Sequence, residues 1–192
     1  MNTSAAVKAE CDVCCTSANA LEIVESLGAR EVILVPDQYL AAHVAANTHV
    51  GIIAWRGRCE VHERFTGAEI AEYRRMTSTF VLAHPECPPD VQLAADYVGS
   101  TSGMIAALEQ RRPARAALLT ECSMADNICT GFPETEFLRP CNLCPHMQRI
   151  TLPRIHAALT HLHPAIEVPA NVASGARSCV QRMFDIAARR AA

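Results

Sequence analysis

Short apolar runs alternate with helix-like segments along the chain, and this pattern occurs twice at a spacing of 84 residues. Residues 6–25 resemble residues 90–109 without a gap, and at the same offset the apolar run 31–37 lies over 115–121. Both apolar runs have the length and the flanking residues of buried parallel strands. A repeated alternation of strands and helices predicts α/β units around parallel sheets.

Each repeat is predicted to contain a short helix, a strand, a second helix and a further strand. The first strand is expected to end within residues 12–17 in one repeat and within residues 96–102 in the other. A strand over 79–84 precedes Glu86, and Glu86 aligns with Asn2. The counterpart of that strand falls ahead of the first residue, so we expect a truncated chain or a strand supplied by another polypeptide.

The composition narrows the range of functions. Half of the residues are hydrophobic and the net charge is −3, which gives no electrostatic basis for binding nucleic acid or an anionic membrane surface. No apolar run is long enough for a transmembrane helix, and the first residues lack the apolar core of a signal peptide. We therefore expect a cytoplasmic protein, in which ten cysteines do not indicate a disulfide scaffold.

Two cysteines occupy equivalent places in the two repeats. Adding the offset to Cys59 leads to a position one residue before Cys144, so the two match if the second repeat has a one-residue insertion. Cys141 and Cys144 also form a C-x-x-C pair, which is typical of a zinc site, a redox pair or ligands of a metal cluster. Cys59 with His62 offers a second pair for zinc, and thiolates from separate loops suit an iron–sulfur cluster.

Polar residues follow two of the predicted strands. His84, Pro85 and Glu86 come after one, and Ser100 and Thr101 come after the next. Ligands of open α/β sheets bind at the carboxyl ends of strands, where a histidine and a glutamate can move protons and hydroxyls can hold an anion. The alternative is structural, with Ser100, Thr101 and the equivalent Ser17 as helix N-caps.

Several stretches together resemble the quinolinate synthase family, the A protein of bacterial NAD biosynthesis. The combination of WxGxCxVH, HPE, GSTS and CPxM is highly specific to that family. The matching stretches follow the family's order along the whole chain: NTSAAVKAECDVCCTSANAL, VPDQYL, WRGRCEVHERF, HPECPPDV, AADYVGSTSGMI, TECSM, CNLCPHM and RMFD.

The resemblance implies repeated three-layer αβα domains with parallel sheets, three of which surround a pseudo-threefold axis in the family. This sequence would contain the second domain, residues 1–79, and the third, residues 80–192, which includes C-terminal helices. The first domain is absent, so an N-terminally truncated chain is expected.

The implied activity is that of an iron–sulfur-dependent transferase, which condenses iminoaspartate with dihydroxyacetone phosphate to quinolinate for NAD biosynthesis. An aspartate oxidase is the expected source of iminoaspartate. Each domain of the family gives one cysteine to a [4Fe–4S] cluster. Carried over, Cys59 and Cys144 are two ligands, Cys141 is a neighbour, and the remaining cysteine ligand is absent from this chain.

The resemblance also assigns roles around the cluster. His84 is implied to contact substrate, and Glu86 to act as an acid and base. The residues implied to bind substrate are Asn2, Ser17, His62, His84, Pro85, Glu86, Ser100 and Thr101. Without the first domain the chain alone is expected to be inactive.

The residue types and their spacing also allow two other functions. One is a non-catalytic remnant that holds a metal or a small anion. The other is a structural protein stabilised by zinc on Cys141, Cys144, Cys59 and His62.

Overall fold

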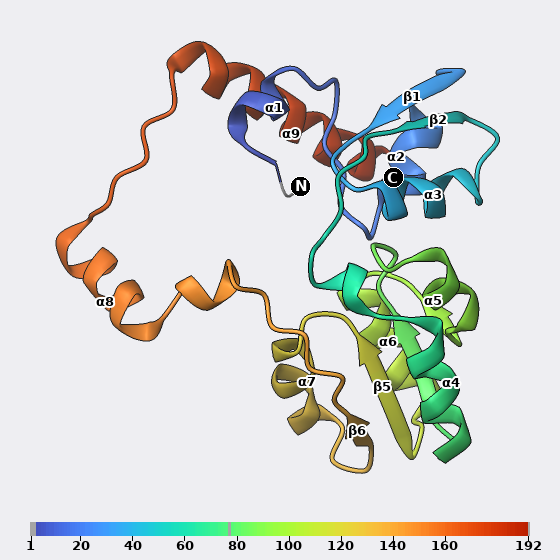
Figure 1. Cartoon of the computed structure of the whole chain (residues 1–192). Coiled ribbons are helices and arrows are strands. Elements are labelled where there is room, and N and C mark those ends of the chain that lie inside the picture. The colour runs from blue at the N-terminus through green and yellow to red at the C-terminus, as the bar shows by residue number, and fades with distance from the viewer. Residues whose placement is uncertain (1–2, 77, 192) are drawn as a thin grey trace. The chain divides into compact units, whose positions relative to one another are not determined.

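The computed structural model describes residues 3–76 and 78–191. The chain forms two compact units, Met1–Leu27 with Pro145–Ala192, and Gly28–Cys144. The predicted domains 1–79 and 80–192 follow the sequence repeat instead, and that division stays a prediction. Figure 1 traces the elements of each unit in chain order.

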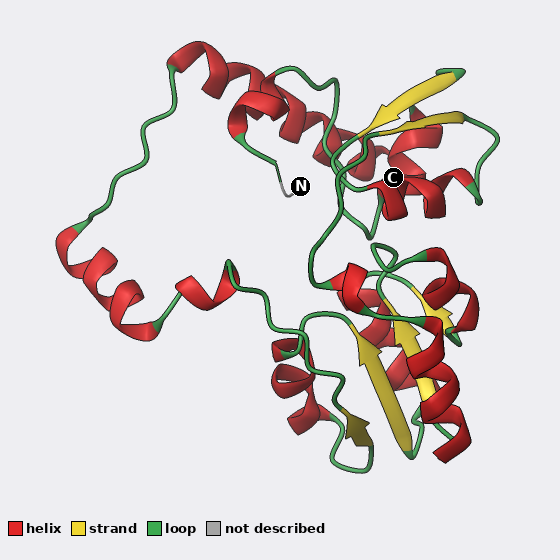
Figure 2. Cartoon of the chain, in the orientation of Figure 1, coloured by secondary structure: helices red, strands yellow, loops and turns green. Residues whose placement is uncertain are grey.

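The larger unit contains a four-stranded parallel sheet with the strand order β4-β3-β5-β6. Its strands are β3 (Phe80–Ala83), β4 (Tyr97–Val98), β5 (Arg115–Leu119) and β6 (Glu136–Leu138). The strands are rich in apolar residues because both faces of the sheet are covered. In Figure 2 the strands (yellow) lie between helices (red).

Helices cover the two faces of this sheet. The helices are α4 (Gly67–Met76), α5 (Pro89–Ala94), α6 (Thr101–Arg111) and α7 (Ser123–Ile128). On one face Val81 and Ala117 pack with Ile70 of α4 and Val91 of α5. On the other face Leu82, Ala116 and Leu118 pack with residues of α6 and α7. The predicted α/β fold with parallel sheets is therefore confirmed, and this sheet is the middle of three layers.

A second sheet in the same unit has only two strands. The parallel strands β1 (Glu31–Leu34) and β2 (Gly51–Ala54) are joined by helix α3 (Gln38–Ala45). Leu34 is buried together with the α3 residues Leu40 and Val44, so α3 covers one face of the strand pair. A 3-10 turn, η1 (His62–Arg64), follows β2 and leads into α4.

The elements match between the repeats. α2 (Ala20–Ser26), β1 and α3 lie at the 84-residue offset from α6, β5 and α7. In β1 and β2 Glu31 pairs with Gly51, and in β5 and β6 Arg115 pairs with Glu136, so the second strands are offset by 85 residues. The structure thus places the one-residue insertion between β5 and β6, upstream of Cys144.

One predicted strand is wrong. β4 forms at Tyr97–Val98, but residues 13 and 14 at the equivalent place are not a strand. Within the described residues, β4 pairs with β3 alone, and no strand of the first repeat corresponds to β3. Instead the backbone N–H of Cys14 donates to the carbonyl oxygen of Cys179 at 3.1 Å. A strand without a neighbour cannot satisfy its backbone groups by pairing, which explains the difference.

The smaller unit is helical. Its helices are α1 (Ala5–Ala9), α2, α8 (Leu152–His161) and α9 (Ala170–Ala191). Gly175 of α9 lies against Ala9, where an added Cβ would be 3.1 Å from the Ala9 Cβ. Cys14 and Cys179 are buried with Ile23 and Met183. Short 3-10 turns occur at η2 (Cys129–Gly131) and η3 (Met147–Arg149).

Within the described residues, no helix combines the length and the apolar character that crossing a membrane requires.

Candidate metal and substrate site

His62 is the centre of a buried polar group in the larger unit. Its Nδ1 lies 3.1 Å from Oε2 of Glu86, and its Nε2 lies 3.0 Å from Oγ1 of Thr120. The ring of His62 stacks on that of His84 with centroids 4.3 Å apart. These residues follow strands β2, β3 and β5, so the fold gathers them at the carboxyl ends of its strands, where ligands of α/β proteins bind.

The two stacked histidines have opposite protonation. Burial disfavours charge on His62, but hydrogen bonds with Cys59 and Glu86 outweigh it and raise the pKa of His62 to about 9. Burial, with the charge of His62 beside it, lowers the pKa of His84 to about 4. Burial works to raise the pKa of Glu86, but the hydrogen bond from His62 holds it below the usual value. At neutral pH an imidazolium therefore lies between a carboxylate and a neutral imidazole.

Glu86 is held by its own loop. Its backbone N–H donates to Nδ1 of His84 at 3.3 Å, which leaves the proton of the neutral ring on Nε2. The side-chain amide of Gln92 donates to the carbonyl oxygens of Pro85 at 2.9 Å and Cys87 at 2.7 Å. These hydrogen bonds hold the HPE segment in place after β3.

Cys59 lies beside this group. The ligand atoms of Cys59, His62 and Glu86 are all within 4.8 Å of one another, a grouping that can hold a metal ion. Burial would raise the pKa of the Cys59 thiol, but hydrogen bonding with His62 lowers it below the ordinary value. The backbone N–H of Cys59 donates to Oδ2 of Asp37 at 3.0 Å. Cys59 is therefore a positioned thiol with thiolate character, which suits a metal ligand.

Cys144 is positioned in the same way in the second repeat. Its backbone N–H donates to Oε1 of Glu121 at 3.2 Å, and Glu121 is the equivalent of Asp37. An isolated parallel bridge follows the strands in both repeats, between Asp37 and Gly57 and between Glu121 and Asn142. In each repeat an acidic residue after the first strand thus orients the cysteine that follows the second.

The zinc set Cys141, Cys144, Cys59 and His62 is not assembled. Cys141 forms a disulfide with Cys122, 19 residues earlier. Among the described residues, the group of Cys59, His62 and Glu86 is the one in which at least three metal-binding side chains come together. Cys59 and Cys144 are both free and half-buried.

The predicted hydroxyl residues have different roles. Ser100 is the N-cap of α6 and accepts from the backbone N–H of Gly103 at 3.2 Å, so the structural alternative holds for this residue. Thr101 is the exposed first residue of α6, next to that cap. Ser17 lies in the turn before α2, whose N-cap is Asn19, so Ser17 is not a cap. Asn2 lies outside the described residues.

Sequence reasoning missed three site residues, namely Asp37, Glu121 and Thr120. Asp37 and Glu121 end the two apolar runs that align in the repeat, and that shared position was a usable signal. Thr120 comes directly after β5, but only the structure shows its contact with His62.

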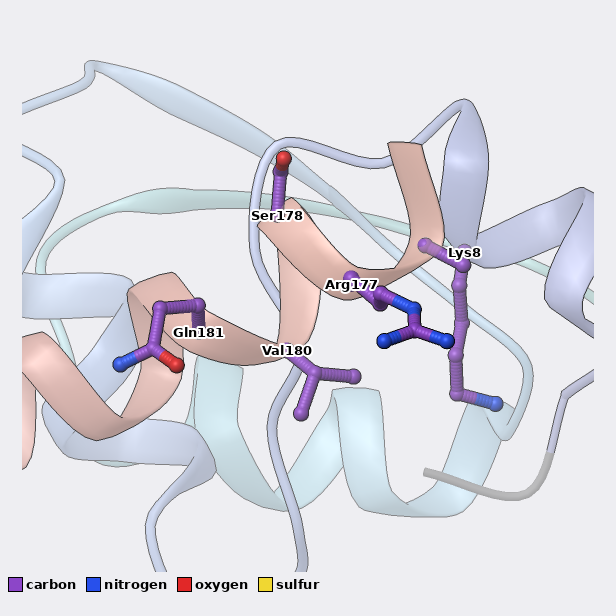
Figure 3. A pocket seen from close by; sticks show the side chains of 6 residues that line it. Lys8, Arg177, Ser178, Val180 and Gln181 are labelled. Carbon is purple, nitrogen blue, oxygen red and sulfur yellow. The ribbon is translucent and has the colours of Figure 1, made fainter. Parts of the chain in front are cut away.

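A separate hollow of about 600 Å³ lies on the smaller unit between α1 and α9 (Figure 3). Its lining includes Lys8 and Arg177 but none of the predicted site residues. The group around His62, which combines an acid, two imidazoles and a thiol, is therefore the candidate functional site.

These observations define an α/β protein with parallel sheets. It carries free thiols and a hydrogen-bonded histidine–glutamate pair after its strands. The family model for "Quinolinate synthetase A protein" matches residues 1–185. The chain belongs to this family.

Curated relatives are similar over nearly the whole chain. "Quinolinate synthase 1" of Mesorhizobium japonicum is 57% identical over 96% of this chain and 57% of its own length. "Quinolinate synthase" of Agrobacterium fabrum is 54% identical over 97% of this chain and 54% of its own length. "Quinolinate synthase" of Xylella fastidiosa is 52% identical over 97% of this chain and 55% of its own length. The chain thus spans a little over half the length of these relatives.

Proposed function

We propose that the chain forms part of the active site of a quinolinate synthase, which condenses iminoaspartate with dihydroxyacetone phosphate to quinolinate, with loss of phosphate and water. The observation that supports this most directly is the repeated placement of Cys59 and Cys144. Each has its backbone N–H bound by an acidic side chain at an equivalent position. Matching hydrogen bonds at equivalent positions favour a shared role for these two half-buried thiols.

The chemistry of Cys59 and Cys144 suits two ligands of a [4Fe–4S] cluster. Both cysteines are free and half-buried, and the lowered pKa of Cys59 favours the thiolate form that binds iron. Cys59 and Cys144 would hold the cluster, and a further cysteine would come from outside this sequence. When bound, the cluster supplies a Lewis-acidic iron that polarises a substrate oxygen.

The chain's own residues supply proton transfer and binding. Glu86 is ionised and fixed, so its carboxylate can take a proton from a substrate carbon or imine and return it. The imidazolium of His62 holds Glu86 at 3.1 Å and keeps it charged. Neutral His84 can donate a hydrogen bond to substrate without adding charge. Pro85 precedes Glu86, and Thr101 follows β4, the strand paired with β3, so both would contribute to substrate binding. Asn2 and Ser17 are substrate-binding residues by the family resemblance alone.

We further propose a cytoplasmic role in NAD biosynthesis, with an aspartate oxidase as the source of iminoaspartate. The substrates are small molecules, and the net charge of −3 favours neither nucleic acid nor a membrane surface as a partner.

Anaerobic reconstitution with iron and sulfide, followed by elemental analysis, tests the ligand assignment. We expect bound iron and sulfide in the parent chain, and loss of most of it in Cys59→Ser and Cys144→Ser. Cys129→Ser is the matched control, since Cys129 is also free and half-buried but lies outside the site. Zinc alone in the parent, or equal iron in all variants, would contradict the proposal.

The isolated chain is expected to form no quinolinate, because it offers only two of the cluster's cysteines. Quinolinate production from iminoaspartate and dihydroxyacetone phosphate by this chain alone would contradict that expectation.

A further inference from the structure

Two buried thiols of the smaller unit lie against each other. Sγ of Cys14 is 3.1 Å from Sγ of Cys179, although the two residues are 165 positions apart in the chain. Both cysteines are free, and their exposed fractions are 7% and 1%. Neither belongs to the group around His62, so the proposed function leaves this pair unused.

Hydrogen bonds between the loop before α2 and helix α9 hold the two thiols together. The backbone N–H of Cys14 donates to the carbonyl oxygen of Cys179 at 3.1 Å. Close by, Nη1 of Arg182 donates to the carbonyl oxygen of Asp12 at 2.9 Å. Met183 of α9 is buried in the same cluster as the two cysteines. The fold of the smaller unit therefore sets the distance between the sulfur atoms.

The two sulfur atoms are almost close enough for a covalent bond. A disulfide joins sulfur atoms at about 2.05 Å, so a movement of about 1 Å would close the gap. Small rotations of both side chains supply such a movement and leave the backbone hydrogen bond in place. Cys87 shows the contrast, since it is also buried but its thiol donates to the carbonyl oxygen of Leu119 at 3.4 Å.

We propose that Cys14 and Cys179 are a modification site, at which a peroxide oxidises the two thiols to a disulfide. The Cys14 thiolate attacks one oxygen of hydrogen peroxide, the O–O bond breaks, and the departing hydroxide takes up the thiol proton. The sulfur of Cys179 then attacks the resulting sulfenic acid. The S–S bond forms, the S–O bond breaks, and the second hydroxide takes up the proton of Cys179. Two electrons pass from the sulfur atoms to the peroxide, which becomes two molecules of water.

The surroundings assign the first step to Cys14. Its thiol is the more exposed of the two, so a small oxidant reaches it first. Burial raises the pKa of the Cys179 thiol to about 12, which keeps Cys179 protonated and disfavours it as the first nucleophile. Cys11 and Cys15 pack against the same cluster and are the rival partners of Cys179 on this loop.

The disulfide would staple the smaller unit, which is built from both ends of the chain. It closes a ring from Cys14 to Cys179 that contains the whole larger unit, Gly28–Cys144. A cross-link between distant positions stabilises a protein chiefly by restricting the unfolded chain. We expect the thermal midpoint of the oxidised chain to rise by about 4 °C or more, and that of Cys179→Ser not to rise under the same treatment.

Mass spectrometry of the oxidised full chain tests the bond directly. The chain is treated with hydrogen peroxide, the remaining thiols are alkylated, and trypsin is added without reductant. Trypsin releases Cys14 within residues 9–30 and Cys179 within residues 178–182. We expect these two peptides as a linked pair, lighter than their sum by two hydrogen atoms, which separates when a dithiol reductant is added.

Four variants identify the partner of Cys179. Cys14→Ser and Cys179→Ser should each lower the yield of the linked pair by at least about tenfold, because only thiols already in reach are bridged. Cys11 and Cys15 lie in the same tryptic peptide as Cys14. Cys11→Ser and Cys15→Ser are therefore the matched controls, and both should keep the yield of the parent.

Three results would overturn the proposal. One is a parent in which peroxide oxidises the half-buried Cys129 but leaves Cys14 and Cys179 as thiols. Another is a linked pair that persists in Cys14→Ser, since the partner would then be a different cysteine. The third is a cross-linked chain whose thermal midpoint is unchanged, which would exclude a staple. No readout involves iron or quinolinate, so this proposal and the proposed function can fail separately.

Discussion

Asp37 connects a helix start to the candidate cluster ligand, and its replacement separates these two roles. Its Oδ1 accepts from the backbone N–H groups of Tyr39 at 2.9 Å and Leu40 at 2.8 Å, which caps α3. Its Oδ2 accepts from the N–H of Cys59 at 3.0 Å. Asp37→Ala removes both functions, whereas Asp37→Asn keeps one oxygen for the cap and turns an NH₂ group toward Cys59.

The structure sets the magnitude of each change. Asp37 is only 3% exposed, so water does not replace a lost partner. Loss of an N-cap costs about 0.5–2 kcal/mol. A buried N–H of Cys59 left without an acceptor costs about 1–3 kcal/mol. We therefore expect Asp37→Ala to lower the free energy of unfolding by about 2–4 kcal/mol. Asp37→Asn should lose only the second contribution, since Asn caps helices as well as Asp.

Urea unfolding followed by circular dichroism measures the total, and amide exchange measures each bond. In Asp37→Asn the amide of Cys59 should exchange faster while those of Tyr39 and Leu40 stay protected. In Asp37→Ala all three should exchange faster. The reasoning is refuted if Asp37→Asn is as destabilised as Asp37→Ala, or if the exchange of Cys59 is unaffected by both.

Three further predictions use the same measurements. Glu121→Gln should speed amide exchange at Cys144, because the acceptor of that N–H is changed; an unaltered rate would contradict the equivalence of the two cysteine loops. Gly57→Ala should destabilise the chain by about 1–3 kcal/mol in urea, since an added Cβ would lie 2.2 Å from the carbonyl oxygen of Pro36. Burial raises the pKa of Cys179 from 9.0 to about 12, so its stabilising contribution is complete below pH 9 and is lost as the pH rises toward 12. The stability difference between the parent and Cys179→Ala should therefore shrink across that range, and a constant difference would refute the shift.

The repeat made much of the fold predictable. Buried parallel strands require apolar runs, and runs at a constant spacing showed that β1 and β5 would be equivalent. The mismatch of one residue between Cys59 and Cys144 located an insertion, which the register of β6 now accounts for. Both inferences rest on the order of apolar residues and cysteines within each segment. A repeated strand keeps this local pattern.

Pairing between distant segments could not be predicted in this way. Residues 12–17 have the pattern of a strand end, but a strand also needs a neighbour, and none is available there in this sequence. Cys14 instead meets Cys179, and their sulfur atoms lie 3.1 Å apart although the residues are 165 positions apart in the chain. No sequence spacing predicts the contact of Cys14 with Cys179, because it depends on how helix α9 packs.

For the same reason, only part of the candidate site could be predicted from the sequence. His62, His84 and Glu86 were expected near substrate from the family resemblance. Their mutual arrangement, with one ring charged and the other neutral, depends on burial and on the partner at each ring nitrogen. Residue identity does not determine either property.

The hydrogen bonds of His62 distinguish between two functions of the group formed by Cys59, His62 and Glu86. The grouping alone also suits a metal such as zinc. However, Nδ1 of His62 is bonded to Glu86 and Nε2 to Thr120, so a metal must displace one partner. In a site formed by Cys59, His62 and Glu86, zinc would lie between Nδ1 of His62 and the Glu86 carboxylate and would break that hydrogen bond, whereas Nε2 would keep its bond to Thr120.

Thr120→Val tests which function applies, because it removes the bond that would orient a metal-binding His62 ring and preserves the shape of the side chain. If His62 were a zinc ligand, the variant would bind zinc about 10–100-fold more weakly than the parent. If His62 instead donates both protons and holds Glu86 in place, zinc affinity stays unchanged and the buried N–H loses its acceptor. The free energy of unfolding then falls by about 1–3 kcal/mol. We expect the second result, since the raised pKa of His62 requires a proton on both nitrogens at neutral pH. Weaker zinc binding in the variant than in the parent, measured by calorimetry, would show that this group is a metal site.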